Sequence, residues 1–509
     1  MFPSDTEFDT KVTLETEAMP IADETPFHIL LLGDWSGRES LQTDSTLLPV
    51  EIDRDNFDEV MKRLRVGLDL NFGEENGVSV LSLKFTEIED FHPDNIFQKL
   101  PLFADLRDVR RKLTKAETFN EAAREVRSWL TNDDIKPNSA EQQQRAPENT
   151  SSASGNLLDQ ILGQSGSDAS AVQKPRTDVS SELNHFVNKL VKPHLVQTDV
   201  EEQSKLLLFV DEVASDLMRK ILHHPHFQAL ESAWRGVHLL VRKAETDFFL
   251  KIFLLDITKK EISANLKSVN DLNDAQLYRT LSVSDESWAM ICGNYTFELN
   301  VDDIAVLIRL AKIGSNLNAP FISGVYPEMF GFRNFDTVPP SDSWRFAEAE
   351  NEGKLWNALR SLPEADFLGL ALPRFLARLP YGEKTEPIEA FYFEEFGSTV
   401  KHDQYLWANG VFICALLLAQ SFRASGWKLS QNLFQNLDGL PVYFYSEDGQ
   451  TKTKSCAEVT MTQSNCEKLI EQGLIPLISF RDTDRIRIGR FQSVGFSESM
   501  LSGRWDQLK

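Results

Sequence analysis

Cysteine is scarce in this chain, which has four cysteines among its 509 residues. The closest two, Cys456 and Cys466, are ten residues apart, and no Cys-x-x-Cys motif or histidine pair with ligand spacing accompanies them. This pattern argues against the common structural zinc sites and favours a reducing compartment, where thiols stay unpaired. Cys292 and Cys414 lie in apolar runs, so we expect both to be small core residues.

Long hydrophobic runs are also missing. The longest one, Val411 to Ala419, is far too short to cross a bilayer. The N-terminal residues are acidic and contain no apolar stretch of the secretory-signal kind. Together these features predict a cytoplasmic protein with no direct membrane insertion.

Positive charge is low, with 53 Lys and Arg residues against 77 Asp and Glu residues and a net charge of −24. Phosphate backbones and anionic membrane surfaces attract basic proteins, so this balance argues against a nucleic-acid or membrane-surface partner. Two interpretations of the acidity stay open. It aids solubility alone, or it forms an acidic surface that meets a basic partner.

Motifs that carry catalysis or bind cofactors are absent from the sequence. It has no phosphate-binding P-loop, no His-Glu-x-x-His zinc motif and no EF-hand loop. Residues 33–37 (GDWSG) lack the order of a nucleophile elbow, and adjacent carboxylates such as Glu394 and Glu395 are more typical of a solvated surface. We therefore predict no catalytic residues, no cofactor and no metal site.

His223, His224 and His226 form the densest cluster of possible metal ligands. Pro225 interrupts this cluster, and no cysteine or acidic residue has the spacing of a fourth ligand. The favoured interpretation is a helix end at which histidine packs or caps. A metal site, or a hydrolase that uses this region, is the disfavoured alternative.

Strand and helix patterns alternate over residues 1–131 and predict a first α/β domain there. Phe27 to Leu32 is an almost continuous apolar run, typical of a strand buried on both faces. Asp55 and Asn56 then precede apolar residues at helical spacing. The remaining expected elements are strands over 11–16 and 78–85 and helices over 92–100 and 106–113.

Residues 132–182 predict a disordered linker, because a long polar stretch cannot bury enough apolar surface to offset the loss of chain entropy. Inside it, residues 156–163 predict a short amphipathic helix with Asn156 and Gly163 as its cap and stop. Its apolar stripe has a shape typical of peptide docking and consists of Leu157, Leu158, Ile161 and Leu162.

Residues 183–509 predict a second, larger α/β domain, so the expected fold class is α/β (mixed α+β). Strand-like apolar runs are expected over 248–255, 288–292, 367–371, 440–445 and 474–480. Helical periodicity is expected over 206–222, 230–241, 301–313, 350–361 and 405–422.

Five strings in this chain resemble the contractile sheath proteins of type VI secretion systems. Residues 26–38 (PFHILLLGDWSGR), 53–61 (DRDNFDEVM) and 90–94 (DFHPD) are similar to the small, TssB-like subunit. Residues 221–236 (ILHHPHFQALESAWRG) and 372–382 (LPRFLARLPYG) are similar to the large, TssC-like subunit. The resemblance implies two sheath-type α/β domains that are fused in one bacterial polypeptide.

The resemblance also implies a non-enzymatic role in a contractile injection apparatus. Family members stack helically around an inner tube and are held together by exchanged strands. The expected partners are sheath subunits (copies of this chain, or separate TssB and TssC chains), the inner tube protein, the baseplate and an AAA+ recycling unfoldase. By the same resemblance, the apolar stripe of residues 157–162 is a candidate unfoldase-binding site.

Seven residues in the family-like strings are candidate structural or interface anchors, because tryptophan and arginine often anchor protein interfaces. For the tryptophans, burial of the ring in the protein core is an equally good interpretation. The candidates are Trp35, Arg38, Trp234, Arg235, Arg374, Arg378 and Trp407.

The family's large subunit continues well beyond the region that ends here near Gly495. The resemblance therefore implies a large-subunit domain without the family's C-terminal strands, and a sheath component or sheath-like accessory is expected. The alternative is a non-polymerising adaptor, chaperone or cap that binds sheath or tube subunits.

Overall fold

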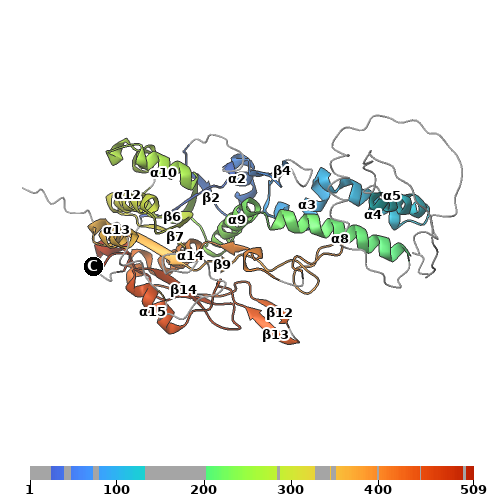
Figure 1. The fold of residues 1–509 in the computed structure, drawn as a ribbon. Coiled ribbons are helices and arrows are strands. Elements are labelled where there is room, and N and C mark those ends of the chain that lie inside the picture. The colour runs from blue at the N-terminus through green and yellow to red at the C-terminus, as the bar shows by residue number, and fades with distance from the viewer. Residues whose placement is uncertain are drawn as a thin grey trace, which may run out of the picture. The chain divides into compact units, whose positions relative to one another are not determined.

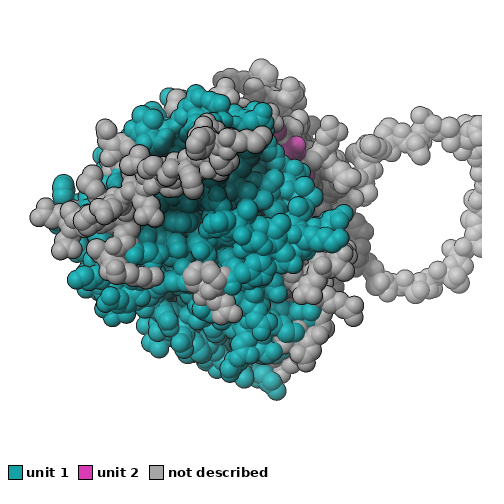
Figure 2. Space-filling model, turned by 90° about the vertical axis from the view of Figure 1, so that its left-hand side faces the viewer, with its two compact units in different colours: residues 1–70, 81–100, 217–509 teal, residues 71–80, 101–216 magenta. Residues whose placement is uncertain are grey.

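The computed structural model describes residues 25–38, 47–72, 80–131, 202–283, 287–326, 344, 351–397, 400–447, 449–496 and 500–508. The chain divides into two compact units. Unit 1 combines residues 1–70, 81–100 and 217–509 and is teal in Figure 2, whereas unit 2 combines residues 71–80 and 101–216. The expected strand over 11–16 and the expected linker over 132–182 lie outside the described residues.

Within the described residues, unit 1 is built on a nine-stranded sheet with the order β11-β15-β14-β8-β7-β6-β1-β5-β2. The six strands from β14 to β5 in this order are parallel, whereas β2, β15 and β11 are antiparallel to their neighbours. The bounds are β1 Phe27–Gly33, β2 Val50–Ile52, β5 Leu250–Asp256, β6 Trp288–Phe297, β7 Phe321–Val325, β8 Leu368–Leu372, β11 Asn436–Leu437, β14 Ile475–Ser479 and β15 Ile486–Ile488.

Strand β1 lies inside this sheet, between β5 and β6. Phe27 to Gly33 pair in register with Leu250 to Asp256, and all seven residues of β1 are buried. The expected strand with two buried faces is therefore confirmed. The segments expected as separate domains, residues 1–131 and 183–509, contribute strands to the same sheet, because an apolar run specifies burial but not which strands flank it.

Helices cover both faces of the sheet (Figure 1). One face packs against helices whose apolar residues share a continuous core with β1, β5, β6 and β8: α10 Lys259–Lys267, α11 Gln276–Val283, α12 Val301–Leu317, α13 Asn351–Arg360 and α15 Gln463–Glu471. Helices α9 (Pro225–Lys243) and α14 (Val411–Ser425) pack against each other, and α14 contacts β1, β6 and β7. Because α14 is apolar all round, it is buried over Val411–Ala419.

Shorter elements complete unit 1. Helices α2 (Phe57–Leu64) and α3 (Pro93–Lys99) lie close to the expected positions. Three strand pairs stand apart from the main sheet: β3 Gly67–Leu70 with β4 Leu81–Lys84, β9 Phe375–Leu376 with β10 Trp407–Ala408, and β12 Tyr443–Glu447 with β13 Gln450–Lys454.

Two expectations for these elements differ from the structure. The strand expected over 78–85 appears as β4 and pairs with β3 rather than joining the main sheet. The helix expected over 405–422 begins at Val411, because Trp407 and Ala408 pair with β9. In both cases the local apolar pattern is right, and the choice of partner comes from the tertiary structure.

Unit 2 consists mainly of α4 (Ala104–Leu113), α5 (Phe119–Thr131) and the part of α8 (Glu202–Leu222) before residue 217. Arg110 Nε lies 2.7 Å from Asp211 Oδ1, and this ion pair joins α4 to α8. The mixed α/β class expected for the chain is confirmed. Among the helices that the structure describes, none has both the length and the apolar character needed to cross a membrane.

Candidate functional site

The loop after β1 is attached to the end of β5 by a buried carboxylate, Asp256. Its Oδ1 accepts the backbone N–H of Trp35 at 2.8 Å, and its Oδ2 accepts the hydroxyl of Ser36 at 2.7 Å and Nε of Arg38 at 2.9 Å. Arg38 also binds both carboxylate oxygens of Glu261, at 2.7 and 2.9 Å. A buried guanidinium with two carboxylate partners is well compensated for its lost hydration.

The tryptophans near this junction are core residues. Trp234 on α9 donates its indole N–H to the carbonyl of Trp35 at 2.9 Å, and the two rings meet edge to face at 6.3 Å. Phe57 on α2 contacts Trp234 from another side, at 5.5 Å between ring centroids. Both tryptophans are 0% exposed, so they join α9 to the β1 loop within this chain.

A second buried ion cluster lies between α9 and the segment after β9. Arg378 Nε donates to Glu231 at 2.8 Å, and its Nη1 donates to Glu395 at 2.7 Å. Arg235 donates to the same Glu231 at 2.7 Å and to the hydroxyl of Tyr381 at 2.9 Å. Two arginines and two glutamates balance in charge, which makes burial of the cluster tolerable.

The electrostatics of this cluster keep Glu395 ionised. Burial raises the pKa of its carboxyl, but the Arg378 guanidinium and the nearby His223 together more than offset this, and the pKa falls to about 2. The sequence-based interpretation of Glu394 and Glu395 as a solvated pair is therefore wrong for Glu395, whose side chain is 1% exposed. Its burial depends on Arg378, a partner 17 positions away that a local pattern does not reveal.

The histidine cluster adjoins this region. His224 caps α9, with its Nδ1 accepting the backbone N–H of His226 at 3.3 Å, as expected for a helix end. His223 Nε2 lies 3.6 Å from Glu395 Oε1, beyond normal hydrogen-bond length. Within the described part of the chain, no group of three His, Cys, Asp or Glu residues has the geometry to hold a metal ion.

A third ion cluster follows β8. Arg374 donates to Glu458 through Nε at 3.0 Å and Nη2 at 2.6 Å, and His402 Nε2 lies 2.8 Å from the same carboxylate. Burial raises the pKa of Glu458, but Arg374 and His402 together outweigh this, and the pKa falls to about 2. The His402 ring stacks on Trp407 at 5.3 Å, and Lys454 Nζ lies 5.2 Å from the centroid of that Trp407 ring.

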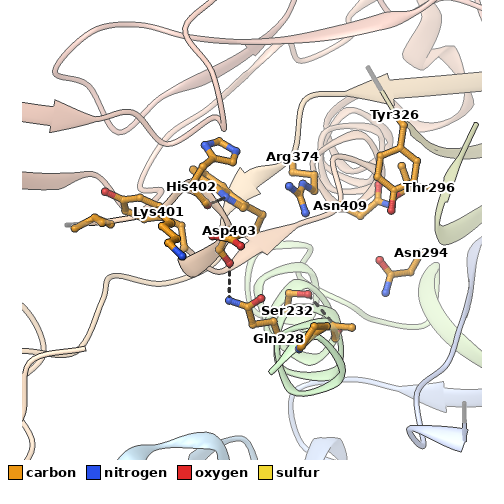
Figure 3. A pocket seen from close by; sticks show the side chains of 15 residues that line it. Gln228, Ser232, Asn294, Thr296, Tyr326, Arg374, Lys401, His402, Asp403 and Asn409 are labelled. Carbon is orange, nitrogen blue, oxygen red and sulfur yellow. Dashed lines mark hydrogen bonds between the residues drawn. The ribbon is translucent and has the colours of Figure 1, made fainter. Parts of the chain in front are cut away.

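A cavity of about 770 Å³ opens beside this third cluster. We call it the carboxyl-end cavity, because Asn294 and Thr296 near the end of β6, Tyr326 just after β7 and Arg374 just after β8 line it. One face of α9 and the segment 400–409 close its other sides. Figure 3 shows Asn294 and Thr296 across the cavity from Lys401 and His402. In open parallel sheets, ligands bind outside the carboxyl ends of the strands.

The structure distributes the seven expected anchors over these three clusters. Trp35 and Arg38 lie in the first cluster, around Asp256, and Trp234 packs beside it. Arg235 and Arg378 lie in the second cluster. Arg374 and Trp407 lie in the third. The sequence analysis missed their acidic partners, Asp256, Glu231, Glu395 and Glu458. The stripe of Leu157, Leu158, Ile161 and Leu162 lies outside the described residues.

Two family models match this chain. Residues 204–495, more than half of the chain, match VipB, described as "EvpB/VC_A0108, tail sheath N-terminal domain". Residues 10–141 match a model described as "Type VI secretion system, VipA, VC_A0107 or Hcp2".

The chain is also similar to a curated protein, the type VI secretion system sheath protein TssC1 of Pseudomonas aeruginosa. The two are 32% identical over 332 residues. The match covers 61% of this chain and 66% of TssC1, so the chain spans just under two thirds of the length of that relative.

Proposed function

This chain belongs to the type VI secretion sheath family, and from that premise we propose that it is a structural component of the contractile sheath. It acts by assembly with other subunits rather than by turning over a substrate. The ionisable clusters fit a structural role, because their arginines and glutamates are paired with each other and mostly buried.

The position of β1 carries this proposal. The strand comes from the segment that matches VipA, whereas its neighbours β5 and β6 come from the segment that matches VipB. A single chain thus supplies both kinds of sheath segment to one sheet. We infer that the chain enters an assembly as a ready-made pair of subunits, without first having to associate with a separate partner.

The hairpin of β12 and β13 is the surface we propose for strand addition. Among the described residues, it pairs with no further strand. Glu447 pairs with Gln450 across a connection of two residues. In two-residue hairpins the closing pair is expected to be hydrogen-bonded. Because hydrogen-bonded pairs alternate along an antiparallel ladder, Thr451 and Thr453 direct their N–H groups outwards, where an added strand can accept them.

Several partners follow from the family and are part of the proposal. They are neighbouring sheath subunits, the inner tube protein, the baseplate and an AAA+ unfoldase that recycles the sheath. The proposed location is the bacterial cytoplasm, where the reduced state of the four cysteines is maintained.

Electron microscopy of the purified full-length chain, alone and mixed with separate TssB and TssC subunits, tests the proposal. We expect ordered tubes or incorporation of the chain into sheaths. The Thr451→Pro variant removes an outward N–H without breaking the hairpin and should assemble poorly, whereas Thr451→Val keeps the N–H and should assemble normally. A wild-type chain that stays monomeric and does not sediment with sheaths would refute the proposal.

A further inference from the structure

The carboxyl-end cavity presents an arginine with unused donors. Arg374 has five side-chain N–H donors, and Glu458 takes two of them. For the remaining three, the structure shows no acceptor among the described residues, and the side chain is 43% exposed. Glu458 binds one edge of the guanidinium, and His402 contacts the same carboxylate. Arg374 itself lines the cavity (Figure 3).

Neutral polar groups lie across the cavity from Lys401 and His402. Asn294 and Thr296 are two positions apart on β6, and both are partly exposed between the buried residues Gly293, Tyr295 and Phe297. No described residue makes a hydrogen bond to the side chain of either one, and both line the cavity. They can donate hydrogen bonds to a group bound in the cavity.

The charge of the cavity differs from that of the whole chain. Arg374 and Lys401 contribute two positive charges to its lining, and Asp403 together with the Glu458 carboxylate bound to Arg374 contributes two negative charges, so the site is balanced, whereas the chain carries −24. A free guanidinium edge binds a carboxylate in a planar, two-point geometry. The surface of another copy, with 77 acidic residues in its sequence, is a ready source of carboxylates.

We propose that the carboxyl-end cavity binds an acidic side chain, Asp or Glu, presented by a loop of a second copy of this chain. Its volume of about 770 Å³ is within the usual range for a binding pocket and accommodates a short loop as well as one carboxylate. The contact rests on the proposed function, because the assembly brings a second copy within reach. It differs from strand addition, because side-chain charge rather than backbone pairing selects the partner.

Charge and shape variants of the full-length chain test this contact. Lys401 is exposed at the cavity rim, and Lys401→Glu should raise the concentration needed for assembly about tenfold, an effect that shrinks at high salt. Ser232→Phe, on the α9 wall, fills the cavity and should act similarly but without salt dependence. Lys428→Glu reverses an exposed charge away from the cavity and should leave assembly unchanged. Sedimentation velocity measures all four proteins.

A thiol placed in the cavity reports occupancy directly. The four native cysteines are buried, so Asn294→Cys provides the reactive thiol. We expect maleimide to label it in the monomer and to be excluded after assembly. Assembly of both cavity variants at wild-type concentrations, with a thiol that stays reactive, would overturn this inference and leave the proposed function standing. A wild-type chain that never assembles would overturn both.

Discussion

Asp256 Oδ2 lies 2.9 Å from Nε of Arg38, although 218 positions separate the two residues in the sequence. This buried pair attaches the loop after β1 to the end of β5, and therefore joins the VipA-matching and VipB-matching segments beside their shared strands. The side chains of Arg38 and Asp256 are 4% and 10% exposed. Removing one partner of a buried ion pair of this kind strongly destabilises the fold.

Removing the Asp256 carboxylate should destabilise the protein strongly. We expect Asp256→Ala to lower the free energy of unfolding by about 3–5 kcal/mol, because Arg38 and two backbone N–H groups lose their buried partner. Urea denaturation of the purified chain measures the change. The matched control is Glu51→Ala, which removes the partly exposed pair with Lys251 and should cost at most about 1 kcal/mol. Equal effects of the two variants would contradict this role of Asp256.

Acid should weaken the second and third ion clusters. The pKa of Glu395 and of Glu458 is lowered to about 2 from an ordinary 4.5, so each carboxylate stabilises the fold fully above pH 4.5. This stabilisation, on the order of 3 kcal/mol for each group, is lost as the pH falls from 4.5 towards 2. Urea denaturation at a series of pH values measures it. In the Glu395→Gln variant, the free energy of unfolding should fall less between pH 4.5 and pH 2 than in the wild type. An equally steep fall would contradict the assignment of this stabilisation to the ionised Glu395.

The contact between α9 and α14 should tolerate no added methyl group at Gly236. A Cβ there would lie 2.3 Å from Cε2 of Phe412, which is fully buried. We expect Gly236→Ala to lower the free energy of unfolding by about 1–3 kcal/mol, which is the usual effect of overpacking a core. Thermal unfolding measures the change. Gly397→Ala is the control, since a Cβ there meets nothing within 4 Å, and its effect should be within about 0.5 kcal/mol.

The apolar stripe of residues 157–162 remains a predicted binding site for an AAA+ unfoldase. Changing Leu158 and Ile161 together to Asp should abolish binding, because charged side chains cannot enter an apolar groove without loss of hydration. Gln160→Asp, on the opposite face of the predicted helix, is the control and should bind normally. Fluorescence anisotropy with purified unfoldase measures both, and unchanged binding of the double variant would reject the role.

The sequence by itself determined the family and most of the elements. Apolar periodicity located β1, α2, α3 and α12, because burial of one face or of both faces leaves a local and readable spacing. The same periodicity did not separate a short strand at Trp407–Ala408 from the helix that follows it. It also did not anticipate β7, which occupies five residues between α12 and α13.

The tertiary structure alone decided which distant segments became neighbours. β1 inserts between β5 and β6, and Arg38, Arg378 and Arg374 each find a carboxylate far along the chain. No local pattern encodes such a pairing, since a buried arginine and its glutamate need only meet in space. The anchors were therefore recognisable from sequence as residue types, while the partners that neutralise them, and the cavity that Arg374 faces, required the fold.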